Sequence, residues 1–199
     1  MQVFSDFLTV WIKFFFILTP FFALSFFIVM TRKMKSSAKT KLAVRVTLAV
    51  IITCSVLYFF GNYIFSIFGI TLDAFRIGAG AILFLSAVDL VRGIKNAPAK
   101  EDGGDFAVVP LAIPVIVGPG TTGALLVMGA ETTELHTRLM GCGSLLSAVF
   151  CVMILLLLAS PIEKIIGQRG LTILSKLTGL VVSAIAAQMI FTGIQNFLK

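Results

Sequence analysis

Long apolar stretches separated by short polar segments run along the whole chain. A helix needs about 20 apolar residues to cross the ~30 Å hydrocarbon core of a bilayer, and six stretches reach that length. They predict transmembrane helices near residues 7–30, 42–66, 72–92, 106–130, 138–160 and 171–197. Little of the chain lies outside them, so the pattern predicts an all-α membrane protein without a soluble domain.

Two of these stretches contain residues that an unbroken helix does not accommodate. The run VVPLAIPVIVGPGTT, at residues 108–122, holds three prolines and two glycines and no charged side chain. Thr19-Pro20 interrupts the first stretch, and each proline removes an amide donor and clashes with the carbonyl one turn back. Lipid supplies no water for broken backbone hydrogen bonds, so such backbone must be packed in protein or line a cavity. Helices 1 and 4 are therefore predicted to be discontinuous.

The two breaks belong to an internal repeat. Pro20 and Pro119 are 99 residues apart, and the segment from Gly69 aligns, with one gap, on the segment from Gly170. Each half has three spans, and because three is odd the second half enters the membrane from the opposite side. Such inverted-topology repeats are common in transporters. We expect one membrane domain that consists of a first repeat at 1–94, a polar cytoplasmic linker at 95–105 and a second, inverted repeat at 106–199.

Composition agrees with a membrane protein, and the positions of the charges predict its orientation. The 199 residues are 58% hydrophobic and 13% charged, against ~25% charged in ordinary soluble domains, and the mean hydropathy is +1.06. The net charge of +7 comes from basic residues at span ends, which argues against a nucleic-acid partner. Eleven of them flank the loops after spans 1, 3 and 5, against Arg138 and Lys199 on the other side. The positive-inside rule then predicts that the basic loops are cytoplasmic and that both termini lie outside. With the resemblance given below, the expected location is the bacterial cytoplasmic (inner) membrane.

Residues suited to catalysis or metal binding are scarce. The single histidine, His136, lies in a polar outer loop, so no HExxH motif, two-histidine metal site or Ser-His pair is available within the membrane. The three cysteines fall within spans without CxxC spacing, which indicates neither disulfides nor a redox motif. We therefore expect no enzymatic activity, no cofactor and no metal site.

The helix breaks are the predicted binding site. A helix that restarts at Pro20 or Pro119 presents free amides and a positive dipole end, equivalent to about half a charge, to the membrane interior. Carbonyls freed on the other side of each break suit an ammonium group or a coupling cation, so a small zwitterion satisfies both ends. The predicted substrate-binding residues are Thr19, Pro20, Phe21, Phe22, Val117, Gly118, Pro119, Gly120, Thr121 and Thr122.

Ionisable residues inside the spans are the candidates for gating or coupling. Asp73 and Arg76 lie one turn apart near the outer end of span 3, where an ion pair that anchors the helix end is the leading explanation. Lys176 is the symmetry mate of Arg76, and its long side chain suits snorkelling to the interface or lining a gate. Asp89 is the candidate for a protonatable coupling residue, with interfacial solvation beside Arg92 as the alternative.

Small residues at helical spacing in the last two spans predict close helix contacts. They are Gly143, Ser147 and Cys151 in span 5, and Gly179, Ser183 and Ala187 in span 6. Gln188, beside the second set, fits either a cavity wall or a hydrogen bond between helices.

Over nearly its whole length the chain resembles a known family. The run VVPLAIPVIVGPGTT, the motif FRIGAGAILFLSAVDLVRGI and the closing LTGLVVSAIAAQMIFTGI, together with the inverted repeat, resemble the MarC family of bacterial and archaeal six-span membrane proteins. That family is related to the small neutral amino acid transporter SnatA. The resemblance implies a substrate site between broken spans 1 and 4 near the bilayer centre, and transport of a glycine- or alanine-like amino acid by alternating access.

The first span departs from the family's pattern. The family motif reads Asn-Pro-x-Gly-x-x-Pro-x-Phe, and this chain has Thr19, Pro20, Phe22, Ser25 and Phe27 at the five specified positions. Phe22 in place of glycine narrows that half of the implied site and covers its backbone.

These observations favour a secondary transporter of small neutral amino acids or similar small polar solutes, coupled to H⁺ or Na⁺. Its expected partners are the solute, the coupling ion, the lipid bilayer and, in a homo-oligomer, further copies of the chain. Two alternatives stay open. One is a non-transporting membrane subunit or interaction protein, in which the breaks are packing features and the phenylalanine-rich first span contacts a partner. The other is a passive channel.

Overall fold

The computed structural model describes residues 2–93, 116–132 and 134–198. Within these ranges all regular elements are helices, and there is no strand. The helices are α1 (Gln2–Ile17), α2 (Pro20–Thr31), α3 (Ser36–Phe68), α4 (Leu72–Arg92), α5 (Pro119–Glu131), α6 (Leu135–Leu157) and α7 (Ala159–Phe197). Five segments of the described chain are long and apolar enough to cross a membrane. The predicted all-helical, multi-pass architecture is confirmed for these residues.

The expected fourth span lies only partly within the described residues. Helix α5, Pro119–Glu131, covers its second half. The predicted linker at 95–105 and the first part of the span, at 106–115, lie outside the described residues. Six spans in two inverted repeats therefore stay a prediction.

Two helices extend well beyond their predicted bounds. Helix α3 begins at Ser36 rather than near residue 42, and α7 begins at Ala159 rather than near residue 171. The extra turns carry Lys, Glu, Gln and Arg, which are good helix formers in water. Within α7 the chain turns at Gly167, whose φ of 68° is left-handed. This kink separates a short first segment of α7 from the long remainder of the helix.

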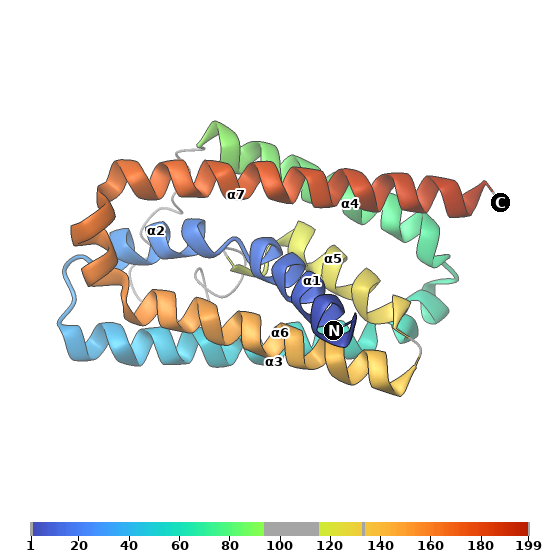
Figure 1. The fold of residues 1–199 in the computed structure, drawn as a ribbon, viewed down its shortest axis with the longest axis horizontal. Helices are drawn as coiled ribbons and strands as arrows, with labels where there is room; N and C mark the ends of the chain where they lie inside the picture. The colour runs from blue at the N-terminus through green and yellow to red at the C-terminus, as the bar shows by residue number, and fades with distance from the viewer. Residues whose placement is uncertain (1, 94–115, 133, 199) are drawn as a thin grey trace.

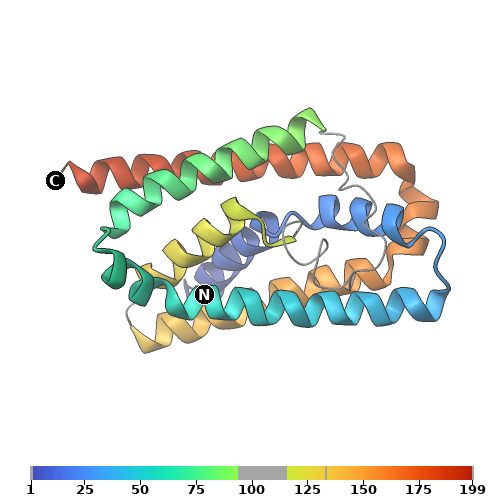
Figure 2. The same ribbon diagram turned by 180° about the vertical axis from the view of Figure 1, so that it is seen from behind.

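The helices form two outer pairs with the shorter segments between them. Helices α4 and α7 pack along each other on one side, and α3 and α6 pack on the other. Helices α1, α2 and α5 lie between the two pairs in both views (Figures 1 and 2). Helix α5 contacts α3 and α4, whereas α1 packs mainly on α6 and α2 on α7. The elements that flank the helix breaks thus occupy the middle of the bundle.

The pair of α4 and α7 approaches closely because glycines from both helices face the partner. A Cβ on Gly80 would lie 2.7 Å from the Ile190 side chain, and one on Gly179 would lie 2.9 Å from the Ala87 carbonyl oxygen. The predicted contact at Gly179 is confirmed, although Ser183 and Ala187 are only half-buried. Small residues let membrane helices pack at short range without a hydrophobic driving force.

In α6 the buried face is displaced from the predicted one. Gly143 is exposed, and Ser147 and Cys151 are half-buried. The face that packs inside carries Gly141, Ser144, Leu145, Ala148, Val149 and Val152. Small side chains occur on both faces of this helix, so their spacing alone did not identify the packed one.

Candidate functional site

The first break lies where the sequence predicts it. Helix α1 ends at Ile17, and α2 begins at Pro20. Thr19 between them has φ 47° and ψ 55°, and is the non-glycine residue with positive φ in the described part of the chain. The amides of Leu18 and Thr19 donate to the Phe14 and Phe16 carbonyls at 3.0 and 2.9 Å, which closes the end of α1.

At the second predicted break, the described residues show how the following helix starts. Gly118 is extended, with φ −79° and ψ 177°, and α5 begins at Pro119. The helical conformation is disfavoured for a residue that precedes proline, which explains why α5 starts at Pro119 and not earlier. The amide of Thr122 donates to the Gly118 carbonyl at 2.8 Å. Neither α2 nor α5 has a side-chain cap at its first turn. The first backbone N–H groups of both helices therefore need hydrogen-bond acceptors from elsewhere.

The structure brings the two breaks into contact. The hydroxyl of Thr121, in the first turn of α5, donates to the carbonyl of Ile17 at the end of α1 at 3.0 Å, across 104 residues of sequence. Thr121 is buried. One carbonyl freed by the first break is therefore satisfied by the helix that starts after the second break. Thr121, predicted from the second half of the chain, thus lies beside the end of α1.

Gly120 serves helix packing. A Cβ on this residue would lie 2.7 Å from the Leu83 Cα and 3.1 Å from the Ser86 Oγ, both in α4. The close approach of α4 thus explains the glycine without any ligand. Gly120 was expected to admit a ligand to the backbone; the space beside it is filled by the protein.

The remaining predicted residues of the breaks have mixed surroundings. Pro20 and Val117 are buried. Phe21 and Phe22 are half-buried and contact the rings of Phe15 and Phe26, respectively. Pro119 and Thr122 line an apolar groove of about 500 Å³ between α4 and α5, together with Ile70, Ala74, Phe75, Gly78, Ala79, Ile82 and Gly123.

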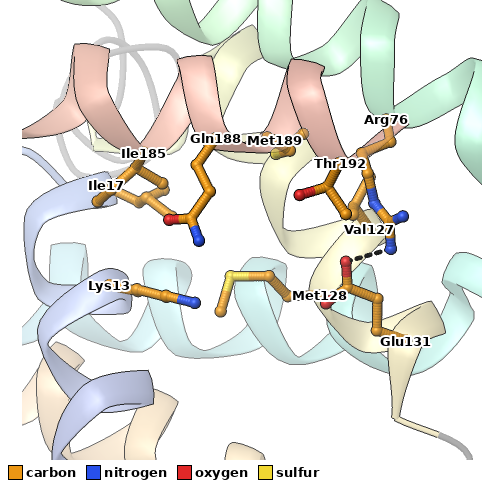
Figure 3. A pocket seen from close by; sticks show the side chains of 10 residues that line it. All are labelled: Lys13, Ile17, Arg76, Val127, Met128, Glu131, Ile185, Gln188, Met189 and Thr192. Atoms are coloured by element: carbon orange, nitrogen blue, oxygen red, sulfur yellow. Dashed lines mark hydrogen bonds and ion pairs between the residues drawn. The ribbon is translucent and has the colours of Figure 1, made fainter. Parts of the chain in front are cut away.

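A polar cavity of about 230 Å³ lies beside the first break, between α1, α4, α5 and α7. It is lined by Lys13, Ile17, Arg76, Val127, Met128, Glu131, Ile185, Gln188, Met189 and Thr192 (Figure 3). Ile17 belongs both to this lining and, through its carbonyl, to the contact between the breaks. The charged and amide groups of the cavity are thus adjacent to the predicted site.

An ion-pair network forms one wall of this cavity. Arg76, with its side chain 7% exposed, donates from Nη1 to Asp73 Oδ1 at 2.7 Å and from Nη2 to Glu131 Oε1. The predicted ion pair of Asp73 and Arg76 is confirmed, and Glu131 extends it to α5. The amide of Asn196 in α7 also donates to Asp73, at 3.4 Å. The network ties together three helices around the cavity.

Sequence reasoning missed Lys13 and Glu131 and left Gln188 undecided. Lys13 is a lone charge within the apolar run WIKFFFIL, and an ionisable residue inside a span is a functional candidate by default. Glu131 closes the fourth span, where a carboxylate is typical of an interfacial position. The structure places all three side chains at one cavity, and those of Lys13 and Gln188 point into it (Figure 3).

The other two gating candidates lie elsewhere. Asp89 and Lys176 are exposed, and neither lines the polar cavity. Asp89 is in the last turn of α4, and its carbonyl accepts from the Gly93 amide at 3.0 Å. The Lys176 Cε would lie 3.9 Å from a Cβ on Gly93, so this lysine reaches the end of α4.

Five described segments of this length and apolarity define a multi-pass integral membrane protein. The sequence pattern of the MarC family of integral membrane proteins matches residues 4–198, and the chain belongs to this family. It is 36% identical over 146 residues to a UPF0056 membrane protein of Methanocaldococcus jannaschii, which covers 70% of this chain and 71% of the relative. It is 30% identical over 151 residues to a UPF0056 membrane protein of Aquifex aeolicus, with 70% and 69% covered. No solved structure matches the chain.

Proposed function

We propose that this chain is a secondary transporter of small neutral amino acids or similar small polar solutes, working by alternating access and coupled to H⁺ or Na⁺. The contact between the two breaks, from the Thr121 hydroxyl to the Ile17 carbonyl at 3.0 Å, carries the proposal. Discontinuous helices that meet in the middle of a bundle supply backbone donors and acceptors to a solute and its coupling ion.

The proposal includes six spans in two inverted repeats. Under that symmetry α2 corresponds to α5, α3 to α6, and α4 to α7. The packing supports this correspondence in two ways. Helix α2 contacts α7, and its counterpart α5 contacts α4, the counterpart of α7. Each of the two outer pairs, α3 with α6 and α4 with α7, consists of a helix and its own counterpart. Both α2 and α5 also begin with proline after a residue without a side-chain cap.

Uptake by the purified protein in liposomes tests the proposal. We expect saturable uptake of labelled glycine or alanine that responds to an imposed Na⁺ or pH gradient. Gly118→Val should abolish it, because the side chain covers the start of α5, while the extended backbone at residue 118 accommodates a β-branched residue. Gly143→Ala, at an exposed position of α6 where an added Cβ would have its nearest contact at 3.9 Å, is the control away from the breaks and should transport normally. Unchanged uptake in Gly118→Val would reject a site at the breaks.

A non-transporting membrane subunit is the second candidate, and one observation favours it. Gly120 is explained by the approach of Leu83, and the Thr121 hydroxyl is satisfied within the chain, as expected if the breaks served packing alone. Purification of a stoichiometric partner together with the absence of uptake for any tested solute would favour this candidate. Flux that fails to saturate would instead indicate a passive channel.

A further inference from the structure

The charges around the polar cavity are unevenly paired. Asp73, Arg76 and Glu131 form a connected network with two carboxylates and one guanidinium, so the network carries a net charge of −1. Lys13 adds a positive charge and has no ion pair or hydrogen bond with any residue in the described part of the chain. The four groups are neutral in sum, but their charges are separated: Lys13 comes from α1 and the network from α4 and α5 (Figure 3).

We propose that this cavity is a binding site for a small zwitterion, in which the Lys13 ammonium binds the carboxylate and Glu131 binds the ammonium group. These side chains adjoin the breaks through Ile17, which lines the cavity and whose carbonyl accepts from Thr121. The inference rests on the proposed function, because it names the groups that select the solute of that transporter.

Lys13 needs a partner that the described residues do not provide. The residue is half-buried within a span, and a cation there is costly unless it is paired or solvated in a cavity. Its ammonium points into the cavity, and the Gln188 amide points in from α7 (Figure 3). A carboxylate between them would accept from both side chains, and bonds between charged donors and carboxylates are the strong ones.

Glu131 keeps acceptor capacity for the other end of the solute. Its Oε1 accepts from Arg76, and a carboxylate has about four lone-pair sites on its two oxygens. The side chain is 44% exposed, so it is accessible from the cavity. Arg76 holds this carboxylate in place at the cavity wall, which leaves the second oxygen, Oε2, for an ammonium group.

The cavity also limits the size of the solute. Its volume of about 230 Å³ suits an amino acid with a small side chain. The apolar part of the wall contains Met128, Ile185 and Met189, and methionine adapts its shape to what it packs against. We expect the solute's side chain to lie against these residues, with its charged groups toward Lys13 and Glu131.

Binding of labelled alanine to the full-length protein in nanodiscs tests the site. Lys13→Met should weaken binding about tenfold or more, as expected for loss of a charge-assisted bond. Lys13→Arg should retain most of the affinity. Lys164→Met, at an exposed lysine of α7 outside the cavity, should bind as the unchanged protein does. Propionate lacks the ammonium group of alanine and ethylamine lacks its carboxylate, so neither should compete.

Three results would overturn the proposal. Alanine binding unaffected by Lys13→Met would remove Lys13 from the site. Competition by propionate as strong as that by unlabelled alanine would indicate a site for anions rather than zwitterions. Absence of alanine binding to the unchanged protein would reject the zwitterion assignment, and gradient-driven uptake of another solute by the same preparation would then show that the proposed transport function stands without it.

Discussion

Gly120 follows the second break directly and packs against the backbone of α4. A Cβ added to this residue would lie 2.7 Å from the Leu83 Cα, which is too short for any side chain, so one of the two helices must shift when a side chain is added. Gly78, on α4, faces open space and is also helical. The two glycines therefore separate the effect of packing from that of helix propensity.

We predict that Gly120→Ala lowers stability and Gly78→Ala does not. Inserting an extra methyl group into a packed interior costs about 1–3 kcal/mol, whereas alanine in place of an exposed helical glycine gains up to about 1 kcal/mol. Thermal unfolding of the purified protein in detergent measures both variants. Equal Tm values for Gly120→Ala and the unchanged protein would mean that α4 and α5 are not in contact at this point.

The sequence predicts the contacts of some cavity residues and not those of others. The pair of Asp73 and Arg76 follows from a spacing of one helical turn, which places the side chains on one face. Glu131, which is 55 residues from Arg76 in sequence, also forms an ion pair with it. A contact over this separation cannot be predicted from helical spacing. Lys13 was recognisable as a charge within an apolar run, but its neighbours on α5 and α7 depend on how the helices pack.

At the scale of the element, the first break depends on a residue in an unfavourable conformation. Thr19 has φ 47°, and the left-handed region costs an L-residue roughly 1–2 kcal/mol. Asparagine adopts this conformation more readily than other non-glycine residues, and the related family motif has Asn at this position. Thr19 is β-branched, which makes its conformation more costly still.

Thr19→Asn is predicted to raise stability by about 1 kcal/mol, because it relieves part of this backbone cost. Thr19→Val keeps the branched side chain and should give no gain, so it is the matched control. Thermal unfolding in detergent compares the two variants. A decrease in Tm for Thr19→Asn would contradict a left-handed residue at the break.

The ends of elements were harder to predict than the breaks within them. Proline predicted the break before Pro20 and the helix start at Pro119, because its effect on the backbone is local. The starts of α3 and α7 depend on whether residues such as Lys, Glu and Arg continue a helix beyond its apolar region. The length of the apolar region does not indicate whether they do. Gly167 kinks α7 through its positive φ, a conformation that a glycine permits but does not require.

At the scale of the whole molecule, basic residues gather at the helix ends on one side of the bundle. The connection between α2 and α3, the end of α4 and the start of α7 lie toward one end of the bundle (Figure 1). Arg32, Lys33 and Lys35 belong to the first of these segments, and Arg92 ends α4. Arg138 is in the first turns of α6, toward the opposite end. The charge asymmetry predicted from the sequence is thus an asymmetry of the folded molecule.

This arrangement predicts the orientation in the membrane, with the basic end in the cytoplasm. Helices α3 and α6 begin at opposite ends of the bundle (Figure 1), and Ser36 and His136, at their starts, are both exposed. In a chain with Cys54, Cys142 and Cys151 replaced by alanine, an impermeant maleimide added to intact cells should label His136→Cys and spare Ser36→Cys. Labelling of Ser36→Cys only after the cells are opened is the control for its reactivity. The reverse pattern would place both termini in the cytoplasm.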